Sequence, residues 1–565
     1  MKPTNKIILA TGALTLVANV GVYAAKRQSS ERPNIIFILT DDQRYDLLNF
    51  TGNPHIQTPN LEQLAKDGVF FTNAHVSTAI SSPSRTCILT GKYERNHGLN
   101  FNSGTSLSDA AWNECYPMVL RESGYYTGYI GKNHTPIGKD GYDTGLMDES
   151  YDYWYGSHQN VGFYPQTQHD IYKGAKSTTQ VEVLEEGVMD FLDPNERNLA
   201  GAVSFLKSRP ADQPFFLNLC FNLPHNSSVQ AMKMKTTDPE TYRTLHRNAD
   251  GTPADYVDAP KNYIAKKDIK IPRLPHSIHP VENRQSSYKY VNTVDSVIEW
   301  KCREMEVIAG IDMLIGNLRD ELKRQGIDDN TIIIFTSDHG IFKGEYGMGG
   351  KALCYEICTR VPMFIYDPRN PKKMAGQFRD DLVLALDVAP TILDYAGAPI
   401  PDSYQGASLA PLVEKRADRV RDYLFTENLW STQFGNPRCE SVQDKEWKYI
   451  RYYENKNQYA IQSSSNAADL GLKGNVAYNV GLSDAIMYRN FVEARVKYHE
   501  EPVYEELFNL KDDEWEETNV IGDKKNSAIL EKMRKECDIQ LKMARGEGNP
   551  KVYLITEEMY GTEIK

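Results

Sequence analysis

The sequence lacks a Cys-x-x-Cys pair, an excess of basic residues and, after residue 22, any apolar run long enough to cross a membrane. Its eight cysteines are spread thinly over 565 residues, so their spacing predicts no metal framework and leaves any disulfide pairing open. The formal net charge of −12 argues against nucleic acid as a partner. An anionic substrate must therefore be attracted by a local pocket of cations, since the overall field opposes it.

The N-terminus has the three parts of a secretory signal peptide. Lys2 and Lys6 precede an apolar run over residues 7–22, and small residues follow at Ala24 and Ala25. An uncleaved membrane anchor is the alternative, but the run is short and interrupted by polar residues. No cysteine lies near the cleavage site, which argues against a lipoprotein anchor. We expect residues 1–24 to be removed and the protein to be exported, without stable membrane insertion.

Apolar stretches alternate with helical patterns through the first two thirds of the chain. The apolar stretches predict strands at 34–39, 125–131, 214–223, 331–336 and 361–366. Periodic apolar residues predict helices at 58–68, 299–325 and 386–393. Polar residues follow the carboxyl ends of several strands, where open α/β sheets hold their sites. We therefore predict an α/β fold with a large mixed, mostly parallel sheet sandwiched by helices.

The last third of the chain has a different character and predicts a smaller C-terminal subdomain. Aromatic-rich segments predict antiparallel strands, and a closing helix follows, at 423–427, 447–453, 505–510 and 527–541. We place the catalytic domain at 25–415 and the subdomain at 416–565. The polar stretch 455–499 is either an insertion near the substrate pocket or a surface loop. Trp430, Trp447 and Tyr452 either stack on sugar rings or pack the small sheet.

The segment 81–91, Ser-Ser-Pro-Ser-Arg-Thr-Cys-Ile-Leu-Thr-Gly, predicts a helix with chemistry at its start. Pro83 suits a first turn, and Gly91 suits the C-terminal end. Ser81 then lies at a helix N-terminus, where backbone N–H groups attract an anion. Arg85, one turn on, projects from the same face. The alternative is an ordinary helix start with a surface arginine.

Two pairs of candidate metal ligands follow predicted strands. Asp41 and Asp42 follow the first strand, and Asp338 and His339 follow the strand at 331–336. Adjacent carboxylates repel each other unless a cation lies between them. Oxygen ligands favour Ca²⁺, with Mg²⁺ as the alternative, and the imidazole widens the choice towards transition metals. Each pair alone could be a helix cap or a loop pair.

The pattern Ser-x-Pro-Ser-Arg-x-x-x-Leu-Thr-Gly at 81–91 resembles the signature of type I sulfatases, which belong to the alkaline phosphatase superfamily. The two pairs of candidate metal ligands and several Lys and His residues match that family in order over roughly 34–365. At position 133 this sequence has asparagine where the family has tryptophan. The resemblance implies the superfamily's fold, with oxidation of Ser81 to formylglycine (3-oxoalanine). It implies metal ligands at Asp41, Asp42, Ser81, Asp338 and His339.

The resemblance also implies a role for each remaining residue. Arg85, Lys132 and Lys351 would neutralise the sulfate oxygens. His225, with Lys351, would protonate the leaving alcohol, and His134 would take the proton whose removal releases sulfate. A site of this family with serine in place of cysteine at the oxidised position resembles the sites that a radical iron–sulfur enzyme matures in bacteria. We therefore expect that maturase as a partner and the bacterial periplasm as the location.

We predict that the protein hydrolyses sulfate esters on a carbohydrate, such as a glycosaminoglycan or a mucin-type oligosaccharide. Sulfate, phosphate and phosphonate groups are all tetrahedral anions, and arginine, lysine and Ca²⁺ can bind each of them. A phosphate or phosphonate ester hydrolase is therefore one alternative. A catalytically silent protein that binds sulfated glycans is another, if Ser81 is never oxidised. Arg95 and His97 are either surface residues, which we favour, or part of a sugar subsite.

Overall fold

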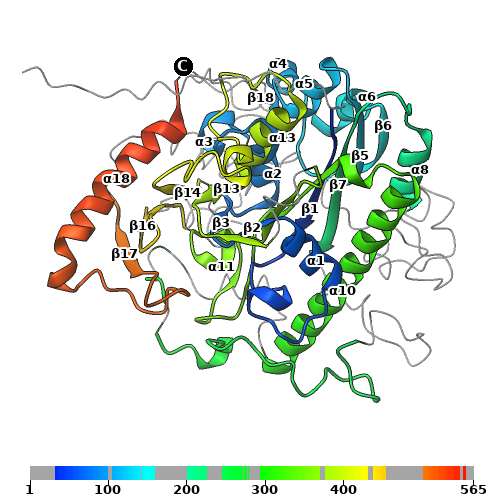
Figure 1. Ribbon diagram of the computed structural model, residues 1–565. Coiled ribbons are helices and arrows are strands. Elements are labelled where there is room, and N and C mark those ends of the chain that lie inside the picture. The colour runs from blue at the N-terminus through cyan, green and yellow to red at the C-terminus, as the bar shows by residue number, and fades with distance from the viewer. Residues whose placement is uncertain are drawn as a thin grey trace, which may run out of the picture. The chain divides into compact units, whose positions relative to one another are not determined.

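Strand β1 (Asn34–Asp41) lies in the middle of an eight-stranded sheet in the computed structural model (Figure 1). The strands follow the order β12 (Gln377–Arg379), β2 (Val69–Phe71), β11 (Met363–Tyr366), β8 (Thr331–Ser337), β1, β7 (Phe215–Pro224), β5 (Tyr126–Asn133) and β6 (Tyr153–His158). β11 runs antiparallel to both of its neighbours, and the other pairs are parallel. The predicted large mixed, mostly parallel sheet is confirmed.

The side chains of β1 alternate between two apolar cores. Ile35 and Phe37 belong to one core, with residues of helices α2 (Ser81–Thr90), α5 (Tyr116–Glu122) and α13 (Val388–Ala396). Ile36 and Ile38 belong to the other, with residues of α1 (Pro59–Asp67), α8 (Ala200–Ser208) and α10 (Val294–Arg324). Because successive strand residues point to opposite faces, both faces of the sheet are covered (Figure 1).

A second sheet of four antiparallel strands forms near the end of the chain. Its strands are β14 (Leu424–Asn428), β15 (Cys439–Gln443), β16 (Trp447–Tyr452) and β17 (Tyr504–Asn509). Helix α18 (Ser527–Arg545) packs against this sheet through Met533, Cys537 and Leu541 (Figure 1). The predicted C-terminal antiparallel sheet and closing helix are confirmed.

The aromatic residues of the small sheet pack within the protein. Trp447 is partly buried against the core beneath α18, and Tyr452 is fully buried. Of the two alternatives for these residues, packing of the sheet is the one observed. The strand at Cys439–Gln443 was not predicted, because its sequence is mostly polar.

Shorter elements complete the fold. They are β3 (Ala74–His75), β4 (Thr105–Leu107), β9 (Phe342–Lys343), β10 (Gly349–Gly350), β13 (Val383–Leu384), β18 (Val552–Leu554), α3 (Glu94–His97), α4 (Asp109–Asn113), α6 (Leu146–Ser150), α11 (Glu356–Thr359) and α14 (Ala410–Val413). Most predicted element boundaries agree with the structure to within two residues. The helix predicted from 299 instead begins at Val294.

The structure describes residues 32–99, 105–139, 141–158, 200–225, 245–271, 273–275, 278, 293–369, 376–429, 437–453, 501–547 and 552–554. The predicted signal peptide, the stretch 455–499 and Trp430 lie outside these ranges. Contacts group Pro33–Lys565 into one compact unit, and the boundaries at 24 and 415 stay predictions. Among the described helices, none is long and apolar enough to span a membrane.

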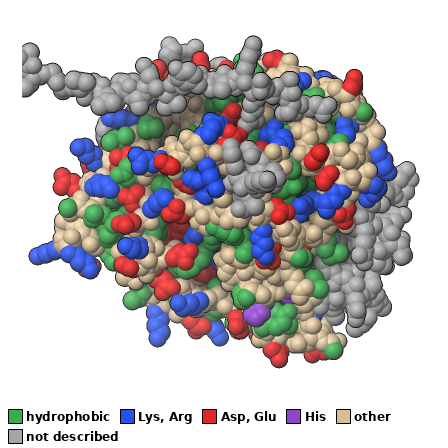
Figure 2. Space-filling model, viewed as in Figure 1, with side chains coloured by type: hydrophobic (Ala, Val, Ile, Leu, Met, Phe, Trp, Pro, Cys, Tyr) green, Lys and Arg blue, Asp and Glu red, His purple; other side chains and the backbone are tan. Residues whose placement is uncertain are grey.

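The surface carries charges of both signs. Figure 2 shows Lys and Arg side chains interspersed with Asp and Glu side chains on the face in view. The formal net charge of the whole sequence is −12. A cationic site in this protein must therefore be built from local residues, as the composition predicts.

Candidate functional site

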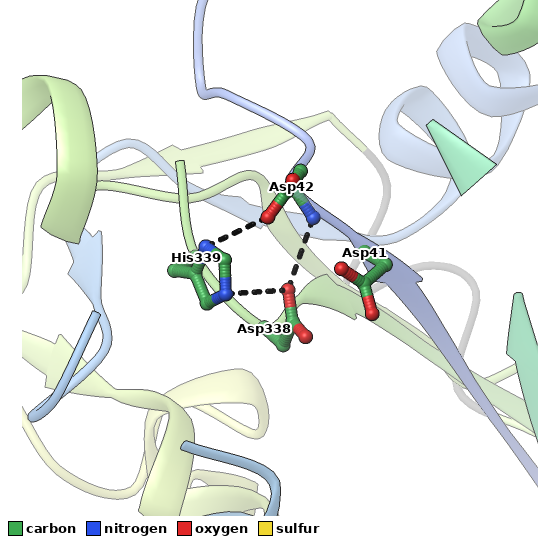
Figure 3. Close-up of side chains that lie close together, drawn as sticks. All are labelled: Asp41, Asp42, Asp338 and His339. Atoms are coloured by element: carbon green, nitrogen blue, oxygen red, sulfur yellow. Dashed lines mark hydrogen bonds and ion pairs between the residues drawn. The ribbon is translucent and has the colours of Figure 1, made fainter. Parts of the chain in front are cut away.

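Four buried residues gather at the carboxyl ends of β1 and β8 (Figure 3). They are Asp41, Asp42, Asp338 and His339, and one ligand atom from each lies within 4.8 Å of those of the others. The two strands are parallel neighbours, so their ends meet. The backbone N–H of Asp338 donates to the carbonyl of Thr40 at 3.0 Å. In return, the backbone N–H of Asp42 donates to Asp338 Oδ1 at 3.0 Å.

The geometry of these residues fits a divalent cation. His339 Nδ1 lies 3.2 Å from Asp42 Oδ1, and its Nε2 lies 3.6 Å from Asp338 Oδ1. Asp41 Oδ1 is buried and accepts no hydrogen bond from the described residues. Burial raises the pKa of Asp42, and it raises that of Asp338 to about 6, with the neighbouring charge of Asp41 adding to the effect. A cation among these oxygens would remove the cost of holding like charges together.

Ser81 lies at the start of α2, against this cluster. Its Oγ is 3.1 Å from His339 Nε2, and the residue is 1% exposed. The helix begins after Ile80, which is extended, and the N–H of Ser84 donates to the Ile80 carbonyl at 3.0 Å. Gly91 ends the helix with a φ of 63°, which agrees with the predicted helix end. The helix therefore presents Ser81 to the four residues of the cluster.

Three cationic side chains surround the carboxylates. Arg85 joins two of them, with Nη2 2.7 Å from Asp41 Oδ2 and Nε 2.9 Å from Asp338 Oδ2. Lys132 also pairs with Asp41, and Lys351 Nζ lies 2.7 Å from Asp42 Oδ1. All three cations are buried, so Arg85 is not the surface arginine of the alternative interpretation.

Two histidines border the same site. The backbone N–H of His225 donates to the Asp41 carbonyl at 3.1 Å, and its Nε2 lies 3.9 Å from Asp42 Oδ2. His134 follows β5 and is 3% exposed. Burial, and then the charge of Lys132, holds the pKa of both imidazoles well below the usual value. Both rings are therefore neutral here and able to accept a proton.

A further pair of side chains lies next to the site, at the ends of the neighbouring strands β5 and β6. Asn133, next to Lys132, lies with its Nδ2 3.0 Å from Nδ1 of His158. The other ring nitrogen of His158 lies 3.0 Å from Asp148 Oδ1. His158 was missed from the sequence because β6 was not predicted. The aromatic residues that open this strand, Tyr153 and Trp154, were the available signal.

The preference for Arg95 and His97 as surface residues is wrong. Arg95 is fully buried, and its guanidinium lies 2.8 Å from Glu427 Oε2 and 2.6 Å from Glu440 Oε1. His97 is 3% exposed, with Nε2 3.3 Å from Cys87 Sγ. A buried charge of this kind is stable only with partners, which here come from the C-terminal sheet. Arg95 therefore ties α3 to that sheet.

The chain matches two family models. The model described as "Sulfatase" covers residues 33–398. The model described as "N-sulphoglucosamine sulphohydrolase, C-terminal" covers residues 344–469. The first match spans the large sheet and all ten residues predicted for the site.

Curated relatives and solved structures agree with these matches. The chain is 27% identical to an N-acetylglucosamine-6-O-sulfatase of Bacteroides thetaiotaomicron, over 80% of this chain and 84% of that one. It is 28% identical to an arylsulfatase of Clostridium perfringens, over 74% and 85% of the two chains. A structure in complex with D-glucosamine-2-N,6-O-disulfate matches with a TM-score of 0.61 at 23% identity, over 91% and 98%. A phosphonate monoester hydrolase of Agrobacterium radiobacter matches with a TM-score of 0.62 at 22% identity, over 90% and 96% of the two chains. At these identities the two structures support the fold of this chain and not its activity.

Proposed function

Because the chain belongs to the sulfatase family and is a sulfuric ester hydrolase, we propose that it removes sulfate from sulfated carbohydrates, with Ser81 oxidised to formylglycine. One observation carries this proposal: Ser81 Oγ lies 3.1 Å from the metal-ligand candidate His339, at a site bordered by three buried cations. A lone serine hydroxyl is a weak nucleophile without an activating base. Formylglycine would supply this chemistry through the hydrate of its aldehyde, a geminal diol whose hydroxyl group can react at sulfur.

We assign the metal ligands to residue 81 and to Asp41, Asp42, Asp338 and His339. Carboxylate oxygens favour a hard cation, and the ion that we propose is Ca²⁺, with Mg²⁺ as the alternative. When bound, the cation supplies positive charge that polarises the sulfate oxygens.

Charge balance supports an anionic substrate. Three carboxylates of the cluster are matched by Arg85, Lys132 and Lys351, all buried in the same site. A divalent cation therefore leaves the site with an excess of positive charge, although the whole protein is acidic. In a buried site this excess is poorly screened, so it favours a sulfate monoester strongly. We assign the three side chains to binding and orienting the sulfate oxygens.

The two neutral histidines are assigned to proton transfer. His225 lies near Asp42, and a bound anion would raise the affinity of its ring for a proton. We therefore assign His225, with Lys351, to protonate the leaving alcohol. Burial and the charge of Lys132 hold His134 neutral, and we assign it to take a proton from residue 81. The two roles need opposite protonation states, which two separate imidazoles can hold at once.

The burial of Ser81 bears on its maturation. At 1% exposure in the folded chain, the side chain is out of reach of a modifying enzyme. We propose that a radical iron–sulfur maturase oxidises Ser81 on the unfolded chain, before export to the bacterial periplasm. Residues 1–24 are the proposed signal peptide.

The substrate class is tested by a panel of mono-sulfated galactose, N-acetylgalactosamine, N-acetylglucosamine and uronate oligosaccharides. The relative named N-acetylglucosamine-6-O-sulfatase makes 6-sulfated N-acetylglucosamine the first member to try. We expect sulfate release by protein produced with the maturase, and none by the Ser81→Ala variant with an intact fold. Release of sulfate by that variant would contradict the assigned nucleophile.

Matched sugar phosphates and phosphonates distinguish the alternative hydrolase. The sulfatase assignment predicts faster turnover of the sulfate than of the phosphate of the same sugar. The reverse order would favour a phosphate or phosphonate ester hydrolase. Tight glycan binding with no turnover, by native protein in which Ser81 is unmodified, would favour a silent glycan-binding protein.

A further inference from the structure

Two cysteines that are far apart in the sequence meet next to the candidate site. Cys354 lies in the loop between β10 and α11, three residues after Lys351, and Cys439 is the first residue of β15. Their Sγ atoms are 3.5 Å apart across a sequence separation of 85. Both side chains are buried, and both are thiols in this structure.

We propose that Cys354 and Cys439 form a disulfide bond that joins the Lys351 loop to the C-terminal sheet. A disulfide has an S–S length of about 2.0 Å, so the two sulfurs must approach by about 1.5 Å. The wide spacing of the eight cysteines could not reveal this pair, because pairing depends on the fold.

The reaction is a thiol–disulfide exchange. The two S–H bonds of Cys354 and Cys439 break, one S–S bond forms, and two protons and two electrons leave the pair. The electrons go to the disulfide of an oxidising protein or of oxidised glutathione, which becomes a dithiol or two thiols. An oxidising compartment, such as the one to which the predicted signal peptide would direct the chain, supplies such a disulfide.

Burial determines when this exchange can occur. Burial raises the pKa of the Cys439 thiol, so the reactive thiolate is disfavoured in the folded protein. The bond therefore forms while the chain folds, and afterwards it is shielded from reductants. This timing makes the crosslink a structural bond and not a rapidly reversible one.

The crosslink would reinforce contacts that already hold the loop. The N–H of Ala352, whose φ is 65°, donates to the Ala79 carbonyl at 2.9 Å, two residues before Ser81. On the other side, Tyr355 Oη donates to Glu506 Oε2 at 2.6 Å. The loop that positions Lys351 thus lies between the Ser81 segment and the C-terminal sheet. A bond from Cys354 to the sheet would fix this loop from the side opposite Ser81.

The direct test is peptide mapping of the full chain recovered from an oxidising compartment. Thiols are alkylated at once, and the protein is digested without a reductant. We expect one linked pair of peptides that contains Cys354 and Cys439, and it should disappear after reduction. Alkylation of both residues in the recovered protein would overturn the proposal. A link to Cys537 on α18 in place of either partner would overturn it equally.

Thermal unfolding gives a second readout. Closing a loop of this length constrains the unfolded chain, so oxidised protein should melt about 4 °C above the same protein reduced. Cys354→Ala and Cys439→Ala should each abolish this difference, and the double variant should do no more. Cys115→Ala is the matched control, since Cys115 is buried and its thiol donates to the Ala111 carbonyl at 3.4 Å. An oxidation-dependent shift that persists in the Cys354→Ala variant would contradict the pairing.

Discussion

Ser81 Oγ lies 3.1 Å from Nε2 of His339, although 258 residues separate the two in the sequence. The contact brings the residue that we propose to be oxidised against a proposed metal ligand. Both residues lie at the ends of regular elements, at the start of α2 and just after β8. Metal binding and the chemistry of residue 81 therefore depend on the same small group of atoms.

Metal binding should depend on the charge of Asp338. The Asp338→Asn variant keeps the shape and one oxygen ligand but removes a charge, so Ca²⁺ should bind at least about 10-fold more weakly. Ca²⁺ that binds only the folded state raises the melting temperature, and the variant should lose most of that rise. Calorimetric titration of metal-free protein measures the affinity directly. An unchanged affinity would contradict the assignment of Asp338 as a ligand.

Arg85 should be needed as an arginine and not only as a cation. Its guanidinium reaches Asp41 and Asp338 at once, and a lysine offers only one point of contact. Arg85→Lys should therefore lower kcat/KM by about 100-fold or more, with the fold retained by circular dichroism. Arg121→Lys is the matched control, because Arg121 is partly exposed and pairs with Asp152. A loss of less than tenfold in Arg85→Lys would contradict the proposed role.

Arg95 should matter for stability and not for turnover. Arg95→Met leaves Glu427 and Glu440 without their common buried partner, so the free energy of unfolding should fall by about 3–5 kcal/mol. The kcat of the folded fraction should not change, since Arg95 has no exposed surface for a sugar. Urea unfolding and kcat, measured on the same samples, separate the two effects. A raised KM with unchanged stability would instead restore the sugar-subsite interpretation.

Stability at acidic pH should depend on His97. Burial lowers its pKa to about 3 in the folded state, whereas an unfolded histidine titrates near 6.5. The neutral folded ring therefore contributes stability above pH 6.5, and this contribution is lost as the pH falls from 6.5 towards 3. Between pH 6 and 4, wild type should lose about 1.4 kcal/mol per pH unit more than His97→Asn does.

Urea unfolding at several pH values measures that difference. At pH 8 the imidazole is neutral in both the folded and the unfolded states, so the wild-type and variant stabilities there serve as the reference. If the free energy of unfolding fell equally with pH in the two proteins below pH 6, His97 would not take up a proton on unfolding, and the prediction would be wrong.

The sequence predicted the long apolar strands of the large sheet and missed the mostly polar strand β15. Residues 35–39 are apolar on both faces, which is typical of a strand covered by helices on both sides. Strand β15 reads Cys-Glu-Ser-Val-Gln, and its Glu440 is buried only because Arg95 and Arg451 meet it there. The antiparallel direction of β11 follows from its neighbours in the sheet, which its own short apolar run does not reveal.

The site was more predictable than its surroundings. Asp41 and Asp338 each follow an apolar strand, so the local pattern places them at the same edge of the sheet. The partners of Arg95 are 332 and 345 residues away, and no local pattern links such positions. The same holds for Cys354 and Cys439, whose proximity appears only in the folded chain.

The most direct test of the account is the mass of the peptide that contains Ser81, taken from protein made in its native host. We predict a mass lower by two hydrogen atoms than that of the serine peptide, or the mass of the hydrate of that species. The Ser81→Ala protein from the same host should show no such change. An unmodified serine in catalytically active native protein would contradict the central claim that residue 81 acts as formylglycine.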